Sequence, residues 1–256
     1  MFAIFKKELR SYFLNAIGYV YLGVFLAISA LLCCYSTLGA GTYDTSNYFS
    51  FITIIFIVLI PLLTMRLFSE EKKLRTEQLL LTSPVSIGGM IFGKFLAAFT
   101  LFAIGIVLSL INFIPLCIFA QRDGINAAYT ADTASAFQQM MAGPVASMIF
   151  SNTLGLLLIG AAFIAIGMFI SSLTENQLAA AIITVAIITT MLLLNIVNGY
   201  VNNYVIRFII SWVCFMSRFA PFQSGLFDPS SLLYFISVAG VFLFLTARVY
   251  DKRRWG

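Results

Sequence analysis

Apolar stretches long enough to cross a lipid bilayer recur along this chain, and they restrict its possible folds more than any other feature. A membrane-spanning helix needs about 20 consecutive apolar residues. Of the 256 residues, 61% are hydrophobic and only 10% are charged, whereas soluble domains carry about 25% charged residues. The sequence therefore predicts an all-α polytopic membrane protein with six transmembrane helices.

The apolar stretches set the expected domain organisation. One transmembrane domain should occupy residues 17–256, and Pro61 should bend its second span because proline removes a helical hydrogen bond. Residues 198–229 are apolar but interrupted by polar and charged side chains, which favours an extracellular pair of short re-entrant or interfacial helices over a full span. Asp228 suits the N-cap of the last span, with Pro229 in its first turn. The expected spans cover residues 17–38, 48–67, 95–120, 145–173, 178–197 and 231–250.

Residues 1–16 have the pattern of an amphipathic helix that lies in the membrane interface. Cations stand on one side and an apolar stripe on the other, as interfacial helices require. A secretory signal is the rival interpretation, but the apolar run at 17–38 exceeds the roughly 7–15 residues of a signal core and lacks a convincing cleavage site. We therefore expect residues 1–16 to be an interface helix and residues 17–38 to be an uncleaved first span. The stripe comprises Phe2, Phe5, Leu9, Tyr12 and Phe13, and the cations are Lys6, Lys7 and Arg10.

The distribution of basic residues predicts the orientation. Basic residues accumulate on the cytoplasmic side of membrane proteins, and in the six-span arrangement twelve fall on one side and three on the other. Both termini and residues 66–86 are therefore expected in the cytoplasm. The larger set is Lys6, Lys7, Arg10, Arg66, Lys72, Lys73, Arg75, Lys94, Arg248, Lys252, Arg253 and Arg254, and the smaller is Arg122, Arg207 and Arg218.

Several kinds of site are disfavoured. Histidine is absent, which removes Ser-His hydrolysis and HExxH metal sites, and no basic groove with interleaved aromatic residues suggests nucleic acid. Gly88–Lys94 matches part of a phosphate-binding loop, but Phe95 follows where Ser or Thr must bind magnesium. We expect Lys94 to extend to the lipid headgroups instead. The cysteines form neither a CxxC motif nor a disulfide framework. No catalytic site and no metal site are predicted.

Residues 66–86 form a charged loop between two apolar spans. Ser69 to Leu74 should extend the second span into water, and Thr76 is a plausible N-cap for a short helix with Glu77 at its positive end. Leucines flanked by charges suit a docking element, since leucines fill a pocket and a polar rim sets the register. An ordinary solvated loop is the alternative. Leu79, Leu80 and Leu81 in a row favour docking.

Four segments, in order, resemble ABC-2 type exporter permeases, and the resemblance runs from end to end of the chain. The most specific is Arg66 to Lys94, with Glu70-Glu71-Lys72-Lys73, Thr76 and Leu79-Leu80-Leu81-Thr82-Ser83-Pro84, which is most similar to the branch containing the gliding-motility permease GldF and the nitrous-oxide-locus permease NosY. The others are Phe5 to Phe13, Ser172 to Gln177, and Gly225 to Trp255.

The resemblance implies the transmembrane subunit of an ATP-driven exporter in a bacterial cell membrane. The chain would bind no cofactor, because ATP and Mg would sit on a separate cytoplasmic ABC ATPase subunit. Other implied partners are the bilayer, a second permease copy or a paired permease, and an auxiliary GldG-like membrane protein. The implied ATPase-coupling residues are Glu70, Glu71, Lys72, Lys73, Arg75, Thr76, Glu77, Gln78, Leu79, Leu80, Leu81 and Thr82. The interface helix would contribute Phe5, Lys6, Lys7, Glu8, Leu9 and Arg10, and a second cytoplasmic connector Thr174, Glu175, Asn176 and Gln177.

One departure from the family pattern and two alternatives remain. Many relatives carry Gly-Thr-x-Glu where this chain has Arg75-Thr76-Glu77-Gln78, so the tight turn and the acidic partner are altered. An ion-coupled secondary transporter would be expected to bury a carboxylate, and Glu175, at the cytoplasmic edge, is the nearest candidate. A non-transporting scaffold could recruit a cytoplasmic protein through the same loop. The substrate is not predicted.

Overall fold

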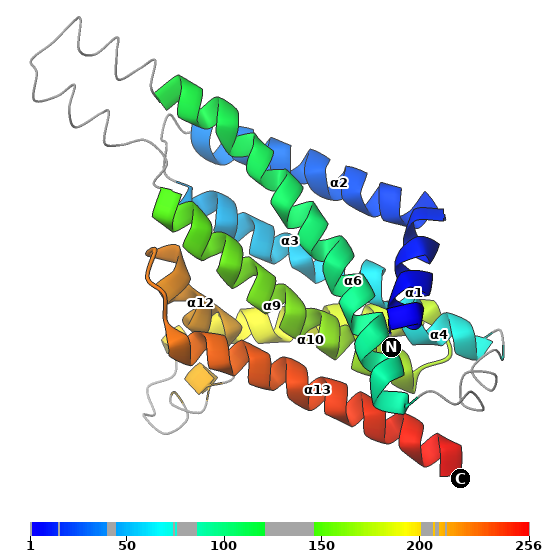
Figure 1. Cartoon of the computed structure of the whole chain (residues 1–256). Coiled ribbons are helices and arrows are strands. Elements are labelled where there is room, and N and C mark those ends of the chain that lie inside the picture. The colour runs from blue at the N-terminus through cyan, green and yellow to red at the C-terminus, as the bar shows by residue number, and fades with distance from the viewer. Residues whose placement is uncertain are drawn as a thin grey trace, which may run out of the picture.

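A computed structural model describes residues 2–14, 16–39, 45–73, 75, 86–120, 146–200, 207, 210–212 and 214–255, and within these ranges the regular structure is entirely helical (Figure 1). Among the described residues, six helical segments are long and apolar enough to cross a membrane. The all-α class and the six spans are thereby confirmed, and the chain is a multi-pass membrane protein. The six segments are Ala16–Thr37, Ser46–Lys73, Ile87–Ala120, Ala146–Leu173, Gln177–Tyr200 and Pro229–Arg253.

The helices follow the apolar stretches closely. A short helix α1 (Phe2–Leu14) precedes α2 (Ala16–Cys33), which continues as a π-helical turn, Cys34–Leu38. The second span consists of α3 (Ser46–Thr64) and α4 (Arg66–Lys73), and the third of α6 (Ile87–Ser109) with the 3₁₀ turn Leu110–Asn112 and helical residues 113–120. The remaining helices are α9 (Ala146–Leu173), α10 (Gln177–Tyr200), α12 (Phe215–Gln223) and α13 (Pro229–Trp255).

Local side-chain chemistry explains where two of these helices begin. The Ser86 hydroxyl accepts a hydrogen bond from the Gly89 N–H, so α6 begins at Ile87 rather than near Phe95. Gly88 to Lys94 therefore lie in helical turns and not in a phosphate-binding loop. Asp228 accepts hydrogen bonds from the Ser230 and Ser231 N–H groups, which is the capping expected for α13. Donation from the Ser231 hydroxyl and these N–H groups holds the pKa of Asp228 below its usual range.

Helix α9 lies at the centre of the bundle and is the most buried of the six spans. Small residues let its neighbours approach closely, as in other membrane helix packings. A Cβ on Gly160 would collide with the Phe102 ring of α6, and one on Gly167 would collide with the Thr64 side chain of α3. These two glycines therefore set the distances from α9 to α3 and α6.

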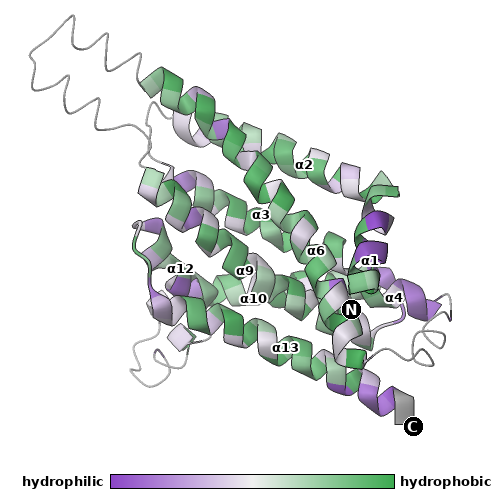
Figure 2. Ribbon diagram, in the orientation of Figure 1, coloured by the Kyte–Doolittle hydropathy of each residue, from purple (hydrophilic) through white to green (hydrophobic). Residues whose placement is uncertain are grey.

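The two ends of the bundle differ in their helices and polarity. Figure 1 shows α1, α4 and both described ends of the chain at one end, and α12 at the other. Hydrophilic residues gather on α1, α4 and the last turns of α13, while the long helices between are mostly hydrophobic (Figure 2). We call the end formed by α1, α4 and the last turns of α13 the charged end.

The segment expected to hold a re-entrant pair contains the helical residues 207 and 210–212 and, after them, the short helix α12. Its buried residues Phe215, Phe219 and Phe222 face the bundle, and a Cβ on Gly155 of α9 would lie 2.7 Å from the Phe219 ring. After α12 the chain turns at Gly225, whose φ of 76° is the left-handed region that glycine adopts freely. Because residues 201–206, 208–209 and 213 lie outside the described residues, a complete second helix of the expected pair stays a prediction.

Candidate functional site

Helix α4 packs against the bundle instead of extending freely into water. The chain turns at Met65, shortly after Pro61, and α4 then buries Leu67, Phe68 and Lys72. On its more exposed face Arg66 donates to both carboxylate oxygens of Glu70, from Nε at 2.8 Å and from Nη2 at 2.7 Å. The predicted helical continuation of the second span is found as far as Lys73, and one face of this extension packs against the bundle.

The Ser171 hydroxyl of α9 completes the junction between α3 and α4. It accepts hydrogen bonds from the N–H groups of Phe68 and Ser69, both at 3.2 Å, and donates to the Met65 carbonyl at 3.2 Å. The first N–H groups of a helix have no partner within it and need a cap. Ser171 thus caps α4 from another helix and attaches α4 to the end of α9.

Lys94 lies inside the protein and does not extend to the headgroups. Its side chain is 1% exposed, and its ammonium lies 2.7 Å from Oε1 of Glu71 and 3.3 Å from Oε1 of Glu8. The same nitrogen donates to the Leu67 carbonyl at 2.8 Å and lies 5.1 Å from the centre of the Phe68 ring. The earlier expectation is wrong because α6 begins upstream of Lys94, which turns this side chain toward α1 and α4. A buried charge needs such pairing to offset its lost hydration.

Two further cations hold the end of α9. Lys72 of α4 and Arg253 of α13, the latter at 3.2 Å, both donate to the Ser172 carbonyl. Carbonyl groups in the last turn of a helix have no partner within it and carry partial negative charge, which cations stabilise. The Phe68 and Tyr250 rings, 5.0 Å apart, extend this contact between α4 and α13.

Helix α1 presents the predicted apolar stripe to the bundle. Phe5, Leu9, Tyr12 and Phe13 are partly buried, whereas Phe2, at the helix end, is exposed. Glu8 lies on the packed side, where it meets Lys94. Burial raises the pKa of Tyr12 far above its usual value, so its hydroxyl stays protonated and donates to the Leu63 carbonyl at 3.4 Å. The predicted cations Lys6, Lys7 and Arg10 are exposed.

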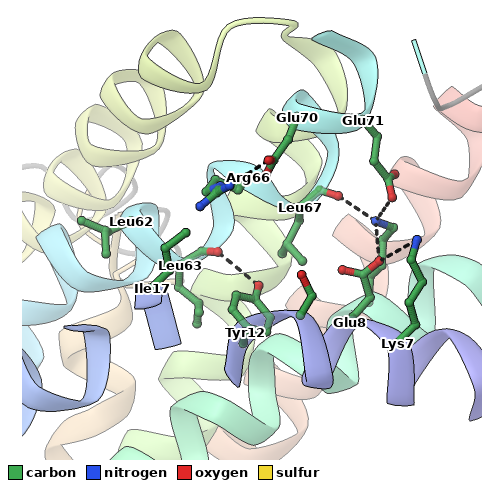
Figure 3. A pocket seen from close by; sticks show the side chains of 12 residues that line it. Lys7, Glu8, Tyr12, Ile17, Leu62, Leu63, Arg66, Leu67, Glu70 and Glu71 are labelled. Carbon is green, nitrogen blue, oxygen red and sulfur yellow. Dashed lines mark hydrogen bonds and ion pairs between the residues drawn. The ribbon is translucent and has the colours of Figure 1, made fainter. Parts of the chain in front are cut away.

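A cavity of about 190 Å³ lies among α1, the α3–α4 junction and the start of α6 (Figure 3). Apolar side chains form one part of its lining: Ile17, Leu62, Leu63 and Leu67. The polar part includes three acids, Glu8, Glu70 and Glu71, and three bases, Lys7, Arg66 and Lys94.

The connector between α9 and α10 is short, as its sequence predicts. Thr174, Glu175 and Asn176 separate the two helices, and Gln177 begins α10. The Asn176 side chain accepts a hydrogen bond from the Leu178 N–H at 3.0 Å and so starts the helix. Glu175 is exposed, which leaves it without the burial expected of an ion-coupling carboxylate. Because Ser172 contacts Lys72 and Arg253, the connector lies at the charged end.

The structure describes only part of the predicted coupling segment. Glu70, Glu71, Lys72 and Lys73 lie on α4. Arg75 follows with a φ of 56°, and its N–H donates to the Lys72 carbonyl at 3.0 Å. Arg75 therefore has the left-handed conformation that favours glycine. Thr76, Glu77, Gln78, Leu79, Leu80, Leu81 and Thr82 lie outside the described residues.

The residues that connect these elements were mostly missed by sequence reasoning. The sequence predicts no contact for Ser171 or Ser172 with α4, and it predicts that Lys94 lies among the lipid headgroups. The position of Lys94 at the start of an apolar span is a signal that could have indicated burial. A lysine that is not at the surface needs a carboxylate partner. Within the described ranges no group of three His, Cys, Asp or Glu side chains is placed to hold a metal ion.

Comparison with protein-family models and with curated protein sequences finds no match to this chain.

Proposed function

We propose that the chain is the transmembrane permease subunit of an ATP-driven ABC-2 type exporter. It would couple ATP hydrolysis by a separate cytoplasmic ATPase subunit to export of a substrate across a bacterial cell membrane. It would have no catalytic site of its own, with ATP and Mg held by the partner. The proposal starts from the four sequence segments that resemble this family, and three of them meet at the charged end: α1, α4 with the start of α6, and the α9–α10 connector.

The observation that carries the proposal is the set of contacts anchoring both flanks of residues 76–85. On one flank, α4 is held to α9 by Ser171 and to α6 and α1 by the Glu71–Lys94–Glu8 cluster. On the other flank, Lys94 itself belongs to the first turns of α6. A force applied to the intervening loop would therefore act on α1, α6 and α9 together. An ordinary solvated loop needs no such anchoring.

The proposed cycle uses this connection. Closure of the ATPase pair would displace residues 70–82, and the displacement would rearrange the spans so that cargo leaves on the opposite side. Helix α12 and the neighbouring residues, as an extracellular re-entrant pair, would close the outer end of the pathway. Both termini would be cytoplasmic.

Dimerisation with a second copy or a paired permease is part of the proposal, because one docking element serves half of a two-site ATPase. Large apolar side chains are exposed along α2, α10 and α13, the three least buried spans, and provide surface for both lipid and a second permease. A GldG-like auxiliary protein would occupy part of the same surface.

The test is a mild-detergent purification of the tagged chain from its own host, followed by an assay of the eluate for vanadate-sensitive ATP hydrolysis. We expect an ATPase subunit to co-elute, and its turnover to fall when Leu79, Leu80 and Leu81 are changed to Ser. Phe2→Ser, at the exposed end of α1, is the matched control. A chain that elutes alone, and does not stimulate any candidate ATPase on reconstitution, would contradict the proposal.

An ion-coupled secondary transporter is the second candidate, favoured by one observation. Glu71 and Glu8 are largely enclosed and pair with the buried Lys94, and enclosed ionisable groups in membrane proteins commonly mark ion pathways. Transport driven by a proton gradient in vesicles without ATP would support it. ATP-dependent transport that persists when the gradient is collapsed would support the exporter. A non-transporting scaffold would show neither proton-driven nor ATP-dependent transport.

A further inference from the structure

The cavity between α1 and the α3–α4 junction shares Glu8, Glu70 and Glu71 with the proposed coupling and interface-helix residues, but the proposed export cycle assigns no ligand to it. A cavity needs about 10–15 Å³ to hold a single water, so a volume of about 190 Å³ accommodates a considerably larger group. Its walls come from the interfacial helix α1 and from the ends of the spans, which places it where lipid headgroups lie if α1 follows the membrane surface.

The charges of the lining select a class of ligand. Three acids and three bases face the cavity, so the site has no net charge that would favour an anion or a cation. These charges form two groups of ion pairs on different sides of the cavity, Arg66 with Glu70 on one side and Lys94 with Glu71 and Glu8 on the other. The Arg66–Glu70 pair uses Nε and Nη2 of the guanidinium, and among the described residues Nη1 of Arg66 has no acceptor. A ligand with both a negative and a positive group matches this arrangement better than one of a single sign.

The positions of the lining side chains would orient such a ligand within the cavity. In Figure 3, Arg66 lies beside Leu62, Leu63 and Ile17, whereas Glu8 and Glu71 lie on the other side of the cavity with Lys7. Leu62 is 37% exposed, so the apolar part of the lining reaches the outer surface of the bundle. From that surface inward, the order is apolar side chains, a guanidinium, and then carboxylates.

We propose that this cavity binds a zwitterionic phospholipid with a primary ammonium, of the phosphatidylethanolamine type. The acyl chains would lie along Leu62 and Ile17, the phosphate would accept hydrogen bonds from Nη1 of Arg66, and the ammonium would donate to the carboxylates of Glu8 and Glu71. The order of the lining from apolar side chains to guanidinium to carboxylates matches the order of acyl chains, phosphate and ammonium along the lipid. A trimethylated ammonium has no N–H to donate, so phosphatidylcholine would bind more weakly. Phosphatidylglycerol, an anionic lipid, has no ammonium to donate to these carboxylates, so it would also bind more weakly.

The experiment uses the full chain in detergent with equal amounts of phosphatidylethanolamine, phosphatidylcholine and phosphatidylglycerol, and native mass spectrometry counts the lipid retained. We expect phosphatidylethanolamine to be retained preferentially, and Arg66→Gln to reduce its retention about tenfold, because a charge-assisted hydrogen bond is lost. Arg248→Gln is the matched control, since Arg248 is an exposed arginine on α13 outside the cavity.

A second variant changes specificity rather than affinity. Glu70→Gln removes one acid from the lining and leaves a net positive charge, so retention should shift from phosphatidylethanolamine toward phosphatidylglycerol by about fivefold. This shift remains informative if Arg66→Gln fails to fold, which the unfolding temperature in lipid-free detergent reports.

Three results would overturn the proposal. Equal retention of the three lipids by the unaltered chain is one. Unchanged retention and unchanged lipid ratio in correctly folded Arg66→Gln and Glu70→Gln variants are another. Displacement of the lipid by a comparable concentration of glycerophosphoethanolamine would show that the site takes a soluble headgroup instead of a membrane lipid. Each readout is independent of any ATPase, so the outcome does not depend on the proposed export function.

Discussion

The ammonium of Lys94 on α6 lies 2.7 Å from Oε1 of Glu71 on α4, at the point where these two helices flank the predicted docking loop. Glu8 of α1 and the Leu67 carbonyl complete the surroundings of the same nitrogen. One side chain thereby holds together an interfacial helix, the end of the second span and the start of the third. Its burial makes these contacts obligatory for stability.

Replacement of Lys94 by Met should destabilise the chain strongly. The variant leaves two largely enclosed carboxylates without their cation, which typically costs about 3–5 kcal/mol. Thermal and denaturant unfolding in detergent would measure the loss. Lys73→Met, at an exposed cation of α4, should have little effect. The double variant Lys94→Met with Glu71→Gln should be more stable than Lys94→Met alone, and equal stability of the single and double variants would show that Glu71 is not the main partner.

Replacement of Ser171 by Ala should loosen α4 specifically. The hydroxyl caps the Phe68 and Ser69 N–H groups, and loss of a cap costs about 1 kcal/mol. Hydrogen exchange at these two amides should accelerate about fivefold. Ser172→Ala is a close control, because the Ser172 hydroxyl donates only to the Phe169 carbonyl of its own helix. If both variants gave the same exchange pattern, the cap from α9 would not exist.

Replacement of Arg75 by Gly should stabilise the turn after α4. A non-glycine residue in the left-handed region costs about 1–2 kcal/mol, which glycine would relieve. Part of that gain is offset, because glycine has greater conformational freedom in the unfolded chain. We expect a net gain of about 0.5 kcal/mol in the free energy of unfolding. Arg75→Ala retains the strain and should give no gain. A gain of the same size in both variants would place the effect in the arginine side chain.

Replacement of Gly160 by Ala tests the close packing of α9. The added methyl group meets the Phe102 ring, and overpacking costs about 1–3 kcal/mol. Gly240 on α13 provides the control, since a Cβ there has open space, and Gly240→Ala should leave stability unchanged or raise it by about 1 kcal/mol. Adding Phe102→Leu to Gly160→Ala should recover part of the loss. No recovery would mean that Phe102 is not the residue that is displaced.

Sequence pattern predicted the spans well because their causes are local. Each apolar run must leave water, and in a bilayer only a helix satisfies its backbone hydrogen bonds. The same holds for the Asp228 cap and for the stripe on α1, where the interacting residues lie within a few positions of one another. The capping of α6 by Ser86 is also a local signal, but the longer apolar run after Phe95 drew the expected start downstream.

The clusters at the charged end depended on the tertiary structure. Lys94 is buried only because α1 and α4 bring Glu8 and Glu71 to it, and Ser171 caps a helix about a hundred positions earlier in the chain. No local pattern encodes such pairs, since the same lysine in an isolated span would reach the headgroups. The sequence alone determined the number and approximate extent of the apolar helices, through the cost of exposing them to water. Packing of those helices decided which charges became buried partners, because burial has a cost that only a correctly placed opposite charge offsets.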